Sequence, residues 1–266
     1  MLAYFPTLFP IPEKLPSRRP NAIQKPLVFI FGLFLLLLLS DTRTISAQEP
    51  TTRDEFWPGI EVYINVKPKV RLYLLGSVSK HIEDGELFNA QSYEAQIGAH
   101  VDYIPNEHLI LRAGYRYGRA VGEKDDGFRE HRLLADQILR KLLPGDLLVT
   151  DRNREEFRFI TGDFSFRYRN RVTIEREFQL SDVPLLRGRT ISPYVSGEIF
   201  YDTRFGAWNR NRYAVGLVQS LRRGPIRRKL LPNRQINLDI YVMRQNDNHP
   251  SQSHINALGA ALIFYF

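Results

Sequence analysis

The sequence predicts an all-β protein: an antiparallel up-and-down transmembrane β-barrel of about 12 strands, with about 10 as the alternative, after an N-terminal signal peptide. Three observations lead to this prediction. Apolar and polar residues alternate with period two along most of the chain. An uncharged apolar run stands near the N-terminus, and the last residues form an apolar row that ends on an aromatic ring.

The apolar run covers residues 27–39 (LVFIFGLFLLLLL) and follows several basic residues. It is too short to span a bilayer comfortably and long enough for the hydrophobic region of a signal peptide. Small residues precede a cleavage point after Ala47. We therefore assign residues 1–47 to a signal peptide and residues 48–266 to an outer-membrane β-barrel domain, with an uncleaved membrane anchor as the alternative.

Composition limits the class of the remaining chain. The sequence has no cysteine, which excludes a disulfide scaffold and a thiolate metal site. The leader carries five basic and two acidic residues, so the formal net charge of +8 falls to +5 after its removal. This modest excess does not indicate a nucleic-acid partner. No later apolar segment approaches the roughly 20 residues of a spanning helix.

The period-two pattern predicts strands with turn signals between them. The clearest run, residues 92–103, alternates an apolar row with a polar one. Residues 129–142 and 147–159 are less regular and resemble helical patterns, but they are predicted as strands as well. In order along the chain, the candidate strands are residues 60–66, 70–78, 92–103, 108–117, 129–142, 147–159, 164–175, 191–201, 212–221, 235–245 and 253–266.

The lengths of the connections predict their side of the membrane. Bacterial outer-membrane barrels have short periplasmic turns, long external loops and an even number of strands. Counting back from Phe266 places the short turns 67–68, 105–107 and 144–146 in the periplasm, with the basic connection 222–233 as a long exception. The same count gives an odd total, so an even barrel needs one strand more or one fewer.

The alternation alone is also typical of a soluble barrel with an apolar interior. Such barrels close with about eight strands, whose side chains fill the lumen or hold one ligand. Eleven or twelve apolar rows would leave a wide interior with too little to fill it. Apolar rows that face lipid and charged rows that face a hydrated lumen remove this difficulty. On the closing strand, the predicted lipid-facing row consists of Leu258, Ala260, Leu262, Phe264 and Phe266.

The chain resembles an uncharacterised family of outer-membrane barrels, domain of unknown function 2490. The resemblance rests on Glu55-Phe56-Trp57 followed by Ile60-Glu61-Val62-Tyr63, the hairpin 65–74, Glu130-His131-Arg132-Leu133, Arg167-Tyr168-Arg169 and the Phe-terminated tail. It implies location in the outer membrane of a Gram-negative bacterium, contact with outer-membrane lipid, and recognition of the strand ending at Phe266 by the outer-membrane assembly machinery. It implies no activity.

Charged residues on the predicted lumen face are the main chemical feature. We expect these residues to line the lumen: Glu94, His100, Asp102, Arg112, Arg116, Arg167, Arg169, Arg171, Glu175, Glu198 and Asp239, with Glu155 and Glu156 as further candidates. A structural network of ion pairs is one interpretation. The other is a pore that favours small anionic solutes, because a ring of arginines attracts counter-ions in a confined channel.

Catalysis is not expected from this sequence. Six histidines are scattered along the chain, and no serine stands in a nucleophile motif with one of them. No phosphate-binding loop or metal-ligand spacing occurs, so we expect no cofactor and no metal. An outer-membrane lipid hydrolase and a soluble periplasmic ligand-binding barrel remain as alternatives to a structural or pore-forming barrel.

Overall fold

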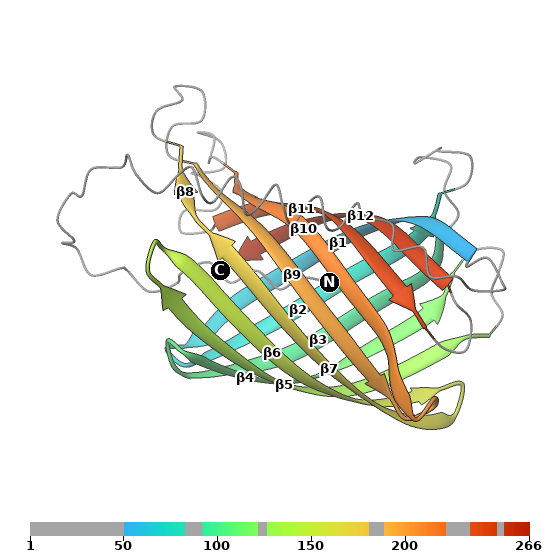
Figure 1. The fold of residues 1–266 in the computed structure, drawn as a ribbon. Coiled ribbons are helices and arrows are strands. Elements are labelled where there is room, and N and C mark those ends of the chain that lie inside the picture. Colours follow the sequence, from blue (N-terminus) through green and yellow to red (C-terminus); the bar gives the residue numbers. More distant parts are fainter. Residues whose placement is uncertain (1–50, 83–91, 122–126, 181–188, 222–234, 249–252) are drawn as a thin grey trace. The chain divides into compact units, whose positions relative to one another are not determined.

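A computed structural model gives the fold as a β-barrel without helices in the described residues (Figure 1). The structure describes residues 51–82, 92–121, 127–180, 189–221, 235–248 and 253–266. The predicted signal peptide and the basic connection 222–233 lie outside these residues.

The strands alternate with short turns and longer connections. They are β1 (Thr51–Lys67), β2 (Val70–His81), β3 (Ser92–Asn106), β4 (Leu109–Ala120), β5 (Arg129–Leu143), β6 (Leu147–Ile160), β7 (Asp163–Arg176), β8 (Phe178–Gln179), β9 (Thr190–Asp202), β10 (Ala207–Ser220), β11 (Gln235–Asp247) and β12 (Ser253–Tyr265).

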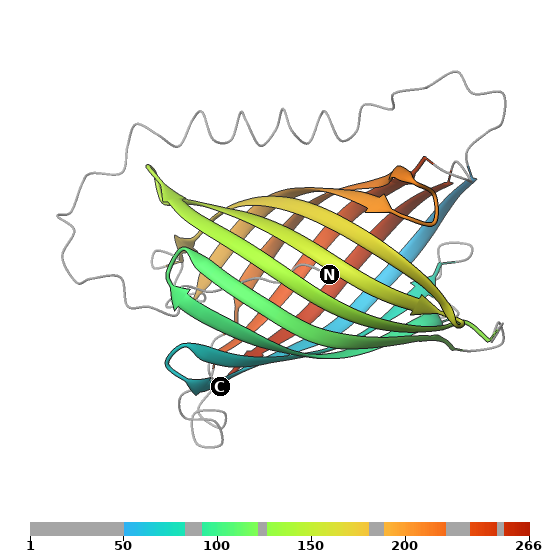
Figure 2. The ribbon, with the colours of Figure 1, turned by 90° about the horizontal axis from the view of Figure 1, so that it is seen from below.

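Neighbouring strands are hydrogen-bonded in sequence order, so the barrel has the predicted up-and-down topology. Each long strand pairs antiparallel with the next, and β7 pairs directly with β9. β12 returns to β1 and closes the ring (Figure 2). The two-residue strand β8 pairs with β9 and stands outside the ring. The sheet therefore has 12 strands, and 11 of them form the wall.

The ring is odd, where the parity argument expects an even number. β1 pairs with β12 in parallel, from Thr51 with Ser253 to Tyr63 with Tyr265. An odd up-and-down ring requires such a parallel closure, because its first and last strands run in the same direction. The backbone of Phe266 also bonds to β1: its N–H donates to the Tyr63 carbonyl at 2.8 Å, and its carbonyl accepts from the Asn65 N–H at 3.0 Å.

Tight turns join the strands where the sequence predicts them. Gly145 and Asp146 have φ values of 85° and 60° in the turn between β5 and β6. A left-handed backbone is routine for glycine and is tolerated by aspartate, so this Gly-Asp pair suits a short hairpin connection. The turn also fixes the register of β5 against β6, from Leu143 opposite Leu147 onward.

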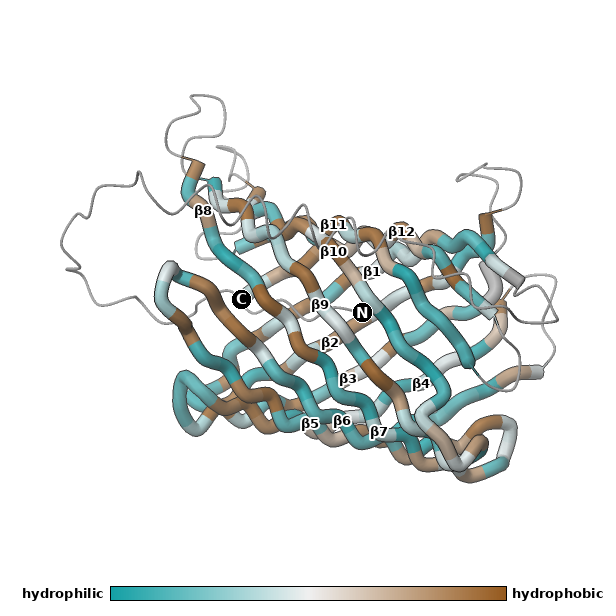
Figure 3. Tube along the Cα trace, in the orientation of Figure 1, coloured by the Kyte–Doolittle hydropathy of each residue, from teal (hydrophilic) through white to brown (hydrophobic). Residues whose placement is uncertain are grey.

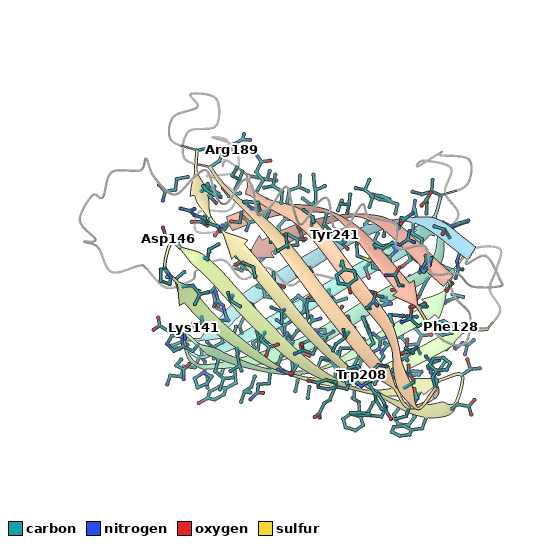
Figure 4. All side chains as sticks on the ribbon, in the orientation of Figure 1. Phe128, Lys141, Asp146, Arg189, Trp208 and Tyr241 are labelled. Carbon is teal, nitrogen blue, oxygen red and sulfur yellow. The ribbon has the colours of Figure 1, made fainter. Side chains whose placement is uncertain are left out.

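Side chains alternate between the two faces of the wall. Along β12 the residues from Ala257 to Ile263 alternate between buried and more exposed positions. Hydropathy changes with the same short period along the strands, as Figure 3 shows. Figure 4 shows side chains on both faces; Trp208 is exposed on the outside, whereas Tyr241 is buried within the barrel.

Candidate functional site

The inner face of the wall carries most of the charged residues of the strands. It does not include the further candidate Glu155, but it includes the eleven residues that we expect to line the lumen: Glu94, His100 and Asp102 on β3, Arg112 and Arg116 on β4, Arg167, Arg169, Arg171 and Glu175 on β7, Glu198 on β9 and Asp239 on β11. Glu94 and Glu175 are half-buried, and the others are buried. The candidate site is therefore the lumen itself.

Glu156 on β6 is the first centre of an ion-pair network. Its carboxylate accepts from Arg167 Nε at 2.7 Å and from Arg169 Nη1 at 2.9 Å. The guanidinium groups of Arg132 and Arg154 approach it at 3.7 Å each. The side chain is 0% exposed, so its charge is balanced by arginines from β5, β6 and β7 rather than by water.

Glu198 on β9 is the second centre. Arg152, Arg169 and Arg171 bind its two oxygens at 2.8, 2.9 and 2.7 Å. Arg169 contacts both Glu156 and Glu198 and so joins the two centres. The contact from Arg152 passes over β7, which ties β6 to β9 across an intervening strand.

Asp102 on β3 forms a third centre on the other side of β5. Arg71 and Arg112 each bind it at 2.6 Å. Arg112 bonds to both oxygens through Nε and Nη2, which is the strong bidentate form of an arginine–carboxylate contact, whereas Arg71 places Nε and Nη2 on Oδ2 alone. Two further sets extend the network: Arg154 binds Asp136 at 2.6 Å, and Arg158 joins Glu130 to Asp202.

An aromatic ladder lines β12, β1, β2 and β3. Tyr265, Tyr63 and Tyr73 stack with ring centroids 5.0 and 4.6 Å apart, and the His100 ring continues the stack 5.0 Å from Tyr73. The next residue in the row is Gly114, where a Cβ would lie 2.3 Å from the His100 ring. The missing side chain thus makes the space that the imidazole occupies.

Glycines accept tyrosine rings elsewhere on the inner face. The Tyr194 ring covers Gly216, and the Tyr241 ring covers Gly259. A Cβ would lie 2.3 Å from the first ring and 2.0 Å from the second, distances that no real Cβ contact shows. These pairs lay the rings flat against β10 and β12 and make the aromatic side of the lumen dense.

Two interior arginines have neutral partners. Arg116 donates to His100 Nε2 at 3.4 Å, and Arg212 donates to Gln245 Oε1 at 2.6 Å. Arg212 also lies over the rings of Trp57 and Phe200. Among the described residues, neither has a carboxylate within the 4.0 Å ion-pair distance. Most of the predicted pore arginines are therefore neutralised, and Arg116 is the exception among them.

The outer face is mainly apolar. Ile97 and Leu142 are each 64% exposed on it. On β12 the outward residues include Leu258 at 36% and Leu262 at 38% exposure, with Ala260 and Phe264 half-buried in the same row. Phe266 is half-buried beyond the end of β12. Contact of this row with lipid stays a prediction.

Apart from Glu156, the sequence prediction missed the inward charged residues of β5 and β6. Arg132, Asp136, Arg152, Arg154 and Arg158 all face inward there. The alternation of apolar and polar residues is weak on these two strands. The inner face of β5 also holds leucine and isoleucine, and the outer face of β6 also holds polar side chains.

One lumen assignment needs correction. Glu155 was a lumen candidate beside Glu156, but it is exposed on the outer face, because adjacent strand residues point to opposite sides. On the same face, the Tyr168 hydroxyl and the Asn170 amide both donate to the side-chain oxygen of Asn153.

The structure shows no metal-binding arrangement among the described residues, since no group of three His, Cys, Asp or Glu side chains converges there. Within the same residues, no helix is long and apolar enough to cross a membrane. His131, on the outer face, contacts the Tyr115 hydroxyl at 2.6 Å.

Comparison with known proteins places the chain in a family. The model of a family described as a protein of unknown function, DUF2490, matches residues 54–256. No curated protein and no solved structure matches the chain. The matched residues include the wall from β1 to the start of β12, and with it the three ion-pair centres. The chain therefore belongs to the DUF2490 family.

Proposed function

We propose that this protein is a structural β-barrel of the outer membrane of a Gram-negative bacterium, with a polar lumen that conducts small ions weakly. The two-sided wall carries the proposal. Its inner face holds buried carboxylates bound by arginines, and its outer face exposes apolar rows to the surroundings. In a membrane barrel, apolar side chains contact hydrocarbon and polar ones face the interior.

The outer rows argue against a soluble ligand-binding barrel. Soluble monomers rarely expose contiguous apolar patches larger than a few hundred Å². Here exposed apolar side chains recur on almost every strand of the wall. Heat modifiability on an SDS gel of the outer-membrane fraction tests this point. A chain recovered in the soluble periplasm with unchanged mobility would overturn the membrane assignment.

The ion pairs favour a structural lumen over a strongly anion-selective pore. Arg112, Arg167, Arg169 and Arg171 each bind a carboxylate, so their charge is largely cancelled. Planar-bilayer recording is the direct test. We expect small conductance and weak ion selectivity, whereas a large, strongly anion-selective channel would contradict the structural interpretation.

An anion-selective pore is the second candidate, and Arg116 is the observation that favours it. This guanidinium is buried without a carboxylate partner among the described residues. If Arg116 attracts anions, Arg116→Gln should reduce the anion preference of any conductance. An unchanged preference would remove this candidate.

We also propose that the chain is not a lipid hydrolase. His131, a histidine on the outer wall, bonds to the Tyr115 hydroxyl, so it does not form the Ser–His pair that such a hydrolase would use. Phospholipid turnover by the purified protein, lost in a His131→Ala variant, would contradict this proposal.

A further inference from the structure

One group of interior carboxylates differs from the ion-pair centres described above. Glu61 on β1 and Asp239 on β11 lie on the aromatic side of the lumen. The Tyr63 hydroxyl donates to Glu61 Oε2 at 3.0 Å, and the Tyr194 hydroxyl donates to Asp239 Oδ1 at 3.1 Å. We name these four residues the acid–tyrosine cluster.

The two carboxylates have no basic partner in the described part of the chain. Asp102, Glu156 and Glu198 each bind two or more arginines, but no Lys or Arg of the described residues lies within 4.0 Å of Glu61 or Asp239. Glu61 Oε1 also has no hydrogen-bond partner there. Both side chains are buried, at 0% and 1% exposure. A buried carboxylate without a cation is costly, so this group is suited to receive one.

The two carboxylates lie on the inner face on either side of β12, one on β11 and the other on β1. In register, Asp239 lies opposite Ala261 of β12, and the next residue in the inner row, Ile263, lies opposite Glu61 of β1. A positive group between β11 and β1 would therefore be shared by both acids.

The donors and acceptors of the cluster define the chemistry of the cation. The Tyr63 hydroxyl donates to Glu61 Oε2, and the Tyr194 hydroxyl lies 3.1 Å from Asp239 Oδ1 and 3.4 Å from Oδ2, so the two carboxylates present acceptor atoms only. Acceptors without donors suit a cation that carries N–H groups. A cation without N–H groups would have to bind against the face of an aromatic ring. The faces of Tyr63 are stacked on Tyr73 and Tyr265, so this ring offers little room for such a cation.

We propose that the acid–tyrosine cluster binds the primary ammonium or guanidinium group of a small organic solute in the lumen. Glu61 Oε1 and the Asp239 carboxylate accept the N–H groups, and the tyrosine hydroxyls hold the two acids in place. This proposal rests on one part of the proposed function, namely that small solutes can enter the lumen. It requires neither a conducting pore nor a particular membrane.

Calorimetric titration of the purified, folded protein in detergent micelles tests the site, with butylammonium chloride as the probe and tetramethylammonium chloride as the probe without N–H groups. We expect butylammonium to bind and tetramethylammonium to bind at least about tenfold more weakly. Glu61→Gln and Asp239→Asn should each weaken butylammonium binding by about tenfold or more. Both substitutions keep the side-chain shape and remove one charge.

Glu94→Gln is the matched control, because Glu94 is an inward carboxylate on β3 that accepts from Gln96. This variant should bind like the wild type. Tyr194→Phe gives a second route to the same answer if Asp239→Asn does not fold, and it should also weaken binding. The site is overturned by no binding in the wild type, by unchanged affinity in the cluster variants, or by an equal loss in Glu94→Gln. Because the titration uses micelles, its outcome is independent of conductance and location.

Discussion

Two adjacent glutamates on β6 provide a matched test of the network. Glu156 faces inward and binds Arg167 and Arg169 within 3 Å, while its neighbour Glu155 is exposed on the outer face. We predict that Glu156→Gln destabilises the barrel and that Glu155→Gln does not. The two substitutions are the same chemical change one residue apart, so only the side of the wall differs.

The size of the stability loss in Glu156→Gln depends on which arginines lose their only carboxylate partner. Removal of one partner from a buried ion pair costs about 3–5 kcal/mol. Arg169 keeps Glu198 and Arg154 keeps Asp136, whereas Arg167 has no other carboxylate within ion-pair distance among the described residues. One stranded guanidinium places Glu156→Gln near the lower bound, at about 3 kcal/mol.

Urea unfolding in lipid vesicles, followed by the fluorescence of the two tryptophans, measures this difference. Glu155→Gln should stay within about 0.5 kcal/mol of the wild type, as surface substitutions usually do. A double variant with Arg167→Gln should cost less than the sum of its single changes, because the stranded charge is then absent. An equal loss of stability for the two glutamates would refute the assignment of the faces.

Three further predictions test other parts of the wall. Gly259→Val should lower the free energy of unfolding by about 1–3 kcal/mol in the same assay, because the new Cβ meets the Tyr241 ring. Gly76→Ala should lower it clearly less, because the space around Gly76 is open. Equal losses would count against the ring contact. Leu258→Arg should destabilise the folded barrel in vesicles by about 2–4 kcal/mol if the residue lies near the bilayer midplane, and no change would speak against lipid contact. Arg116→Asp should fold less well than Arg116→Gln, as measured by the heat-resistant fraction on SDS gels, because it buries a carboxylate; the opposite order would point to an unseen cation nearby.

The sequence predicts the fold well where one face of a strand is purely apolar. On β3, residues such as Ile97 and Val101 alternate with His100 and Asp102, and the period alone identifies the strand and its inner face. On β5 the inner row mixes Leu134 and charged residues, so neither face reads clearly. The expectation of an even number of strands was wrong for a different reason. A parallel pairing of the first and last strands does not change the alternation of apolar and polar residues, so the sequence pattern does not reveal it.

The partners within the lumen could not be predicted from the sequence. Glu198 and Arg152 are 46 residues apart, and their contact depends on the register of three strands. Likewise, Gly259 gives no sign in the sequence that it receives the ring of Tyr241. The alternation places a residue on a face, and only the closed ring decides which residues on that face meet.

The outward row of β12 tests the central claim most directly. The chain has no cysteine, so single cysteines can be introduced at each position from 256 to 264 and labelled with a nitroxide. In lipid vesicles, collision with oxygen, which concentrates in hydrocarbon, should peak at positions 258, 260, 262 and 264 and fall at the positions between them. Peaks at the intervening positions, or no alternation along the strand, would contradict a barrel with this face in the membrane.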